Sequence, residues 1–207
     1  MSGGAYVIDE SARRADTDVW FALPPGFVPL PLEELTAARD PERTAGRLTG
    51  LGPVLRLAHL FLAAGAVRCC LGLHADDQAD GGPLLSLFTL AWRPAEWAPR
   101  SVLAARAASG SATAEYLETL ELPCGPAALV QTRLEAPSEL DLHTPGGLLQ
   151  ITAHIPCPDG RRMAILSLAT TAVERARLYR DLLRDIAGTV SFEDPLPVVS
   201  DDVPEKD

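Results

Sequence analysis

Basic residues are scarce in this sequence of 207 residues: it has 18 against 28 acidic residues, and Lys206 is the only lysine. The net charge of −10 repels phosphate groups. Nucleic acids and anionic membrane surfaces are therefore not expected as partners. Half of the acidic surplus lies at the end, because residues 193–207 carry six acidic side chains and one basic side chain.

Long hydrophobic runs are also missing. A membrane-spanning helix needs about 18 or more consecutive apolar residues, and the most apolar segment, 54–67, contains Arg56 and His59. Residues 1–20 carry acidic side chains where a secretory leader has basic ones, and they contain no apolar stretch. We therefore predict a cytoplasmic protein with no membrane span and no signal peptide. Export without a leader stays open.

Sequence signatures of catalysis and ligand binding are lacking as well. There is no G-x-S-x-G, no P-loop and no G-x-G-x-x-G. Residues 76–81 match half of a calcium-binding loop, but Leu87 stands where that loop needs a bidentate glutamate. We assign no catalytic residue, cofactor or metal, and these features favour a non-catalytic protein over an enzyme.

The four cysteines do not form a metal-binding pattern, since no C-x-x-C pair exists. Cys69 and Cys70 are adjacent in a predicted strand, so their side chains point to opposite faces. On a later strand, Cys157 shares a face with core residues, whereas His154 points to the other side. We therefore expect free cysteines, with Cys157 in the core.

Hydrophobic alternation, divided by turns rich in glycine and proline, predicts antiparallel hairpins with helices between them. The expected strands cover residues 19–23, 67–75, 84–92, 115–122, 129–135, 148–155, 162–169 and 189–192, and the expected helices cover 33–39, 53–64, 94–109 and 171–187. This order predicts an α+β fold: a largely antiparallel sheet of six or seven strands with helices packed on it. One domain is expected over residues 19–193, between a flexible arm at 1–18 and a disordered acidic tail at 194–207.

The last helix has the clearest markers. Thr171 and Glu174 have the spacing of a capping box, in which each side chain bonds a backbone amide near the other. An apolar stripe at helical spacing follows, formed by Val173, Ala176, Tyr179, Leu183 and Ile186. The rest of the helix carries Arg177, Arg180 and Arg184, which either bind an acidic partner or pair with Asp181 and Asp185 within the helix.

Two segments carry a family resemblance. LPPGFVPLPL at residues 23–32 and MAILSLATT…VERARLYRDLLRDIAGTVSF at residues 163–192, together with the element order, resemble the Mog1/PsbP-like fold, which includes LpqN-type actinobacterial proteins. The resemblance spans about residues 18–193 and implies an α/β/α sandwich that binds other proteins, such as a small GTPase or a photosynthetic complex. It implies no shared catalytic site. LpqN-type proteins carry an export signal and a lipid-anchor cysteine, and neither is expected here.

Two tryptophans stand out in a chain with only 5% aromatic residues. Trp92 and Trp97 flank a predicted corner between strand and helix, and tryptophan is favoured at protein interfaces. The other interpretation is that both rings fill the core at the end of the sheet. The candidate interface residues are thus Trp92, Trp97, Arg177, Arg180 and Arg184.

We predict a non-catalytic protein-binding adaptor or accessory subunit, linked to a secretion system or a larger assembly, with self-association included. The alternative is a small-ligand-binding protein or an enzyme with a pocket between sheet and helices. That pocket would use His143 or His154.

Overall fold

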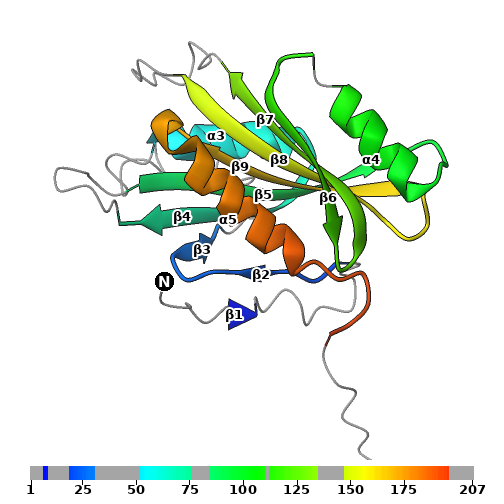
Figure 1. Cartoon of the computed structure of the whole chain (residues 1–207). Coiled ribbons are helices and arrows are strands. Elements are labelled where there is room, and N and C mark those ends of the chain that lie inside the picture. The colour runs from blue at the N-terminus through cyan, green and yellow to red at the C-terminus, as the bar shows by residue number, and fades with distance from the viewer. Residues whose placement is uncertain are drawn as a thin grey trace, which may run out of the picture.

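A computed structural model of the chain (Figure 1) describes residues 7–8, 19–30, 52–75, 84–110, 112–134 and 147–195. Within these residues, seven antiparallel strands form one sheet in the order β3-β4-β5-β9-β8-β7-β6. The strands are β3 (Phe27–Pro29), β4 (Ala66–His74), β5 (Leu84–Pro94), β6 (Ala114–Leu122), β7 (Gly125–Leu134), β8 (Leu148–Pro156) and β9 (Arg162–Thr170). The predicted α+β fold with an antiparallel sheet is confirmed.

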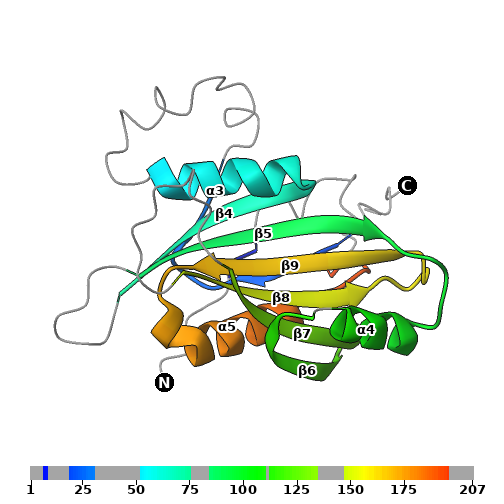
Figure 2. The ribbon, with the colours of Figure 1, turned by 90° about the horizontal axis from the view of Figure 1, so that it is seen from above.

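Helices cover both faces of this sheet. They are α3 (Gly52–Ala63), α4 (Arg100–Ser109) and α5 (Ala176–Gly188), and Figure 2 shows α3 and α5 on opposite sides of the strands. Leu168 of β9 shares the main core with Leu183 and Ile186 of α5. Side chains alternate along a strand, so Met163 points the other way and packs against Leu103 of α4. The neighbouring core cluster under α3 lies on the same face as α4.

The edge of the sheet next to β4 differs from the prediction. Residues 19–23 are predicted as the edge strand, but β3 takes that place. Pro29 fits there because an edge strand tolerates a residue without an N–H group. Ala22–Leu23 forms β2, which pairs with β1 (Val7–Ile8) in a separate two-stranded sheet. The predicted strand at 189–192 is reduced to one bridge between Trp20 and Ser191.

Of the first two described helices, α3 matches its predicted range, and α4 starts later than predicted. The predicted helix at 53–64 is confirmed as α3, and Gly65 after it has the left-handed φ of 91° that often ends helices. The helix predicted at 94–109 begins only at Arg100. Pro99 is its N-cap, and the residue before a proline is disfavoured in helical conformation. Residues 95–99 therefore lie outside the helix.

The start of α5 also differs from the prediction. The capping box of Thr171 and Glu174 does not form, because a short 3-10 helix, η3 (Val173–Arg175), precedes α5 without a side-chain cap. The predicted apolar stripe is confirmed: Tyr179, Leu183 and Ile186 are buried. The remaining stripe residues, Val173 and Ala176, pack at its margin.

Several predictions fall outside the described residues. They concern the helix at 33–39, the calcium-like residues 76–81, His143, the tail beyond residue 195 and most of the N-terminal arm. Among the helices that the structure does describe, none has the length and apolar character needed to cross a membrane.

Candidate functional site

The corner between β5 and α4 is held firmly against the turn between β8 and β9. The amide of Ala95 donates to the carbonyl of Arg161 at 2.7 Å, and the amide of Ala98 donates to the carbonyl of Gly160 at 3.4 Å. Gly160 has a φ of 64°, and a side chain there would approach the Trp97 ring and the Ala98 carbonyl. Glycine thus lets the two segments meet. We call residues 93–106 and 157–162 the arginine corner.

The structure separates the two predicted interface tryptophans. Trp97 lies on the surface of the arginine corner with 65% of its area exposed, the largest value among the exposed large hydrophobic residues of the described chain. Trp92 is half-buried against the main core, with the Arg162 guanidinium 5.3 Å above its ring. An exposed tryptophan on a fixed backbone costs little ordering entropy when a partner covers it.

Five arginines and two acidic residues lie in this corner, a local surplus of three positive charges in a chain of net charge −10. They are Arg93, Arg100, Arg106, Arg161 and Arg162, with Glu96 and Asp159. Sequence reasoning did not single out this cluster, because its members come from three elements that only the fold brings together. The one local signal is the pair of arginines after the predicted turn.

Two of these arginines and one carboxylate already have partners within the protein. Arg100 donates through Nε to the Pro156 carbonyl at 3.0 Å and through Nη2 to the Cys124 carbonyl, which ties α4 to two strand ends. Asp159 accepts the backbone amides of Arg161 and Arg162 at 2.8 and 3.1 Å. It also pairs with Arg162 Nε at 2.9 Å, and the two amide bonds and this ion pair lower the pKa of the Asp159 carboxyl.

The other charged groups of the corner are not used in this way. The side chains of Arg93, Arg106 and Arg161 make no hydrogen bond or ion pair with any residue that the structure describes, and the same holds for Glu96. As far as the described residues show, three guanidinium groups and one carboxylate of the corner are available to a partner.

A pocket of about 450 Å³ lies between α4 and the sheet, lined by residues of the arginine corner and by neighbouring residues of α4, β8 and β9. Its apolar lining includes Leu103 and Met163, both buried. Its polar lining is formed by Arg93, Glu96, Arg106 and His154. Of the two histidines proposed for a pocket between sheet and helix, the structure thus places His154 in one.

His154 occupies the position expected from strand alternation. Ile155 and Cys157 are buried in or beside the core, whereas His154 faces the α4 side. Burial, and after it the charge of Arg93, lowers the pKa of His154 to about 4. The imidazole is therefore neutral at pH 7, with one nitrogen able to donate a hydrogen bond and the other able to accept one.

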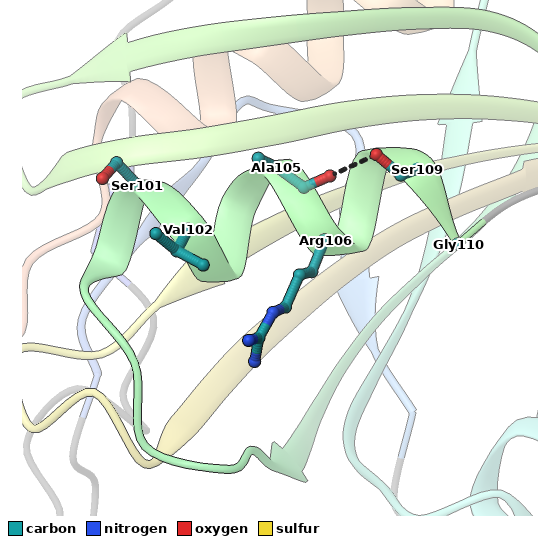
Figure 3. Close-up of a pocket in the computed structure, with 6 residues that line it drawn as sticks. All are labelled: Ser101, Val102, Ala105, Arg106, Ser109 and Gly110. Carbon is teal, nitrogen blue, oxygen red and sulfur yellow. Dashed lines mark hydrogen bonds between the residues drawn. The ribbon is translucent and has the colours of Figure 1, made fainter.

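A second, shallow hollow is lined only by residues of α4 and by Gly110 after it, and Figure 3 shows these residues. Arg106 lines both hollows, and Figure 3 shows its side chain extending from the helix away from Ser101 and Ser109. The Ser109 hydroxyl donates to the Ala105 carbonyl of its own helix at 2.9 Å. This surface therefore offers few free polar groups apart from Arg106.

The predicted arginines of α5 lie over the other face of the sheet and are largely engaged there. Arg184 donates to Glu118 of β6 at 2.6 Å and to Asp181 at 2.5 Å. Arg180 donates to the buried Gln131 of β7 at 2.5 Å. Its guanidinium also lies 4.3 Å from the centre of the Tyr116 ring.

The third of these arginines, Arg177, is 89% exposed and lies 4.0 Å from Asp181. The structure therefore does not bring the three α5 arginines together with Trp97.

The thiols are poorly suited to nucleophilic chemistry at neutral pH. None of the four cysteines forms a disulfide, and burial raises the pKa of Cys69 and of Cys157 to about 11. Cys69 and Cys70 pair with Thr89 and Phe88, neighbouring residues of β5, so they face opposite sides as expected. In the described part of the chain, no three His, Cys, Asp or Glu side chains gather closely enough to hold a metal ion.

Comparison of the chain with protein-family models and with curated proteins found no match.

Proposed function

We propose that the protein is a non-catalytic accessory protein that binds another protein through the arginine corner. The observation that carries this proposal is the 65% exposure of Trp97, in a corner where Arg93, Arg106 and Arg161 have no hydrogen-bond or ion-pair partner among the described residues. Tryptophan and arginine are the residue types most enriched among the side chains that dominate binding energy at interfaces. The α5 arginines are less suited to binding a partner protein, because two of them already donate hydrogen bonds to residues of the sheet.

The charge of the corner indicates the chemistry of the partner. Arg93, Arg106 and Arg161 outnumber the single available carboxylate, Glu96. Guanidinium groups bind carboxylates through paired, charge-assisted hydrogen bonds. The expected partner surface therefore presents acidic side chains around an apolar pocket or groove that receives the Trp97 ring.

Three further lines support a binding role. The Mog1/PsbP-like resemblance implies proteins that bind other proteins, and the sheet with helices on both faces has the layers that this resemblance implies. The raised pKa values of Cys69 and Cys157 argue against thiol catalysis. The acidic chain argues against nucleic acid as the partner. We keep the cytoplasm as the proposed compartment and include self-association among the forms of binding.

The test is affinity capture from lysate of the native cells with four immobilised full-length proteins: wild type, Trp97→Ala, Arg161→Gln and Leu178→Ala. Leu178 is the matched control, because it is a large apolar residue, 55% exposed, on the helix of the opposite face. We expect one stoichiometric protein with wild type and with Leu178→Ala. Trp97→Ala should weaken the purified complex at least about 30-fold, which corresponds to a loss of about 2 kcal/mol.

Circular dichroism of each variant establishes that the fold is retained. A protein captured equally well by Trp97→Ala and Arg161→Gln would contradict the proposed surface. Capture of nothing above background by wild type would contradict the proposed function, unless sedimentation of the wild type shows an oligomer that Trp97→Ala disrupts.

A further inference from the structure

The pocket beneath α4 has an apolar interior and a charged rim. Leu103 is 3% exposed and Met163 is 7% exposed, and both line the pocket. Its volume of about 450 Å³ lies in the lower part of the range typical of small-molecule sites, about 300–1,000 Å³. Side chains from β5, the corner, α4, β8 and β9 all contribute, so the pocket is a product of the tertiary fold.

The rim has a formal charge of +1 at neutral pH. Arg93 and Arg106 are positive, Glu96 is negative, and His154 is neutral because its pKa is lowered to about 4. A ligand with one negative charge would balance this rim, whereas a dianion would leave a surplus charge beside Glu96. Since neither arginine is paired within the described residues, a ligand would not have to break an existing ion pair.

The polar groups also have suitable hydrogen-bonding chemistry. Each guanidinium offers several N–H donors in one plane, and a neutral imidazole offers one N–H donor. A carboxylate accepts from such donors, and its apolar body would lie against Leu103 and Met163. The N–H donors alone, or the apolar lining alone, would not select a carboxylate with an apolar body, but both occur in the same pocket.

We propose that the pocket between α4 and the sheet binds a small organic monocarboxylate, with Arg93 and Arg106 holding the carboxylate and Leu103 and Met163 contacting its apolar body. His154 donates a hydrogen bond to the carboxylate from the floor of the sheet. This site goes beyond the proposed protein interface, because its occupant is a small molecule. The two sites share Arg93, Glu96 and Arg106, whereas Trp97 and Arg161 do not line the pocket.

The experiment titrates purified full-length protein with sodium benzoate and follows the backbone amides and the arginine Nε–H groups by NMR. Benzyl alcohol has a similar body without the charge, and inorganic phosphate has the charge without the body. We expect saturable shifts with benzoate in and around the pocket. Benzyl alcohol and phosphate should each bind at least about tenfold more weakly.

Variants locate the site and separate the two proposals. Arg106→Gln should weaken benzoate binding at least about tenfold, and Leu103→Ala should weaken it while keeping the preference for benzoate over phosphate. Arg177→Gln, an exposed arginine of α5, and Trp97→Ala should leave it unchanged. The two proposals can be tested independently. Loss of protein capture with Trp97→Ala while benzoate still binds supports the protein interface and the pocket separately, and protein capture without benzoate binding contradicts only the pocket.

The protonation of His154 gives a second readout. The charged groups that face its ring in the pocket are Arg93 from β5, Glu96 from the corner and Arg106 from α4. A carboxylate placed beside the imidazole favours its protonated form, so benzoate should raise the pKa of His154 above about 4. Equal binding of phosphate and benzoate, unsaturable shifts, or an unchanged response in Arg106→Gln would overturn the proposal.

Discussion

At the scale of single residues, the ion pair between Glu118 and Arg184 joins α5 to the edge strand β6. Arg184 donates at 2.6 Å, and this bond is the main reason why the pKa of the Glu118 carboxyl is lowered. Tyr116 donates to the same oxygen at 3.0 Å. Each partner of the ion pair is 32% exposed, so solvent screens the pair in part.

Replacing Glu118 with Gln should therefore lower the free energy of unfolding at pH 7 by about 0.5–1.5 kcal/mol. A carboxyl whose pKa is lower in the folded state stabilises the fold above its unfolded pKa, and it loses that effect as pH falls through its folded pKa. The difference in free energy of unfolding between wild type and variant, measured by urea denaturation, should thus shrink as pH decreases from 7 to 3. Glu121→Gln, on the same strand and exposed, is the control with no such gap. A gap that stays constant with pH would mean that packing, rather than charge, is lost.

At the scale of elements, α5 is an amphipathic helix whose buried stripe closes the main core. Leu183 is fully buried among residues of the sheet, and Leu178, on the same helix, is 55% exposed. The two positions carry the same side chain and differ mainly in environment, so they form a matched pair.

Leu183→Ala should lower the free energy of unfolding by about 2–5 kcal/mol, because it removes buried methyl groups and leaves a cavity. Leu178→Ala should change it by no more than about 0.5 kcal/mol. Urea denaturation followed by circular dichroism measures both. Equal effects of the two substitutions would show that α5 does not pack on the sheet as described.

At the scale of the whole molecule, a local positive surface lies on a strongly negative chain. The net charge is −10, although the arginine corner has a surplus of three positive charges. The range of electrostatic forces decides whether an acidic partner is repelled by the net charge of the chain or attracted by the local charge of the arginine corner. That range is about 30 Å at 0.01 M salt, about 8 Å at 0.15 M and about 3 Å at 1 M.

Binding of a short glutamate-rich peptide should therefore be strongest at intermediate salt. At about 0.01 M salt, the negative charge of the whole chain repels the acidic peptide. At about 0.1 M salt, mainly the attraction by the arginine corner remains. At about 1 M salt, both the repulsion and the attraction are screened. Fluorescence anisotropy of a labelled peptide across this series measures the effect, and Arg161→Gln should lower the maximum. Affinity that rises steadily with salt up to 1 M would show that apolar contact, and not the arginines, carries the binding.

The sequence by itself determined much of the architecture. Alternation along a strand specifies which side chains share a face, so the opposite faces of Cys69 and Cys70, and the separation of His154 from Ile155, could be predicted before any pairing was known. The hairpins, α3 and the apolar stripe of α5 follow from local signals for the same reason. Local propensity did not give the correct element boundaries where a tertiary contact or a proline competed with it. This occurred at the start of α4, at the capping residues before α5 and at the edge strand.

Only the tertiary structure decided the candidate sites. Strand pairing brings the β8–β9 turn against the end of β5, and this gathers arginines from three elements in the corner that also holds Trp97. The same pairing brings His154 of β8 and Arg106 of α4 into the lining of one pocket. A sequence shows which residues share a face, but the closure of long loops decides which faces meet. Which charges remain unpaired follows from that closure, because the partners of Arg180 and Arg184 lie on strands more than forty residues earlier in the chain.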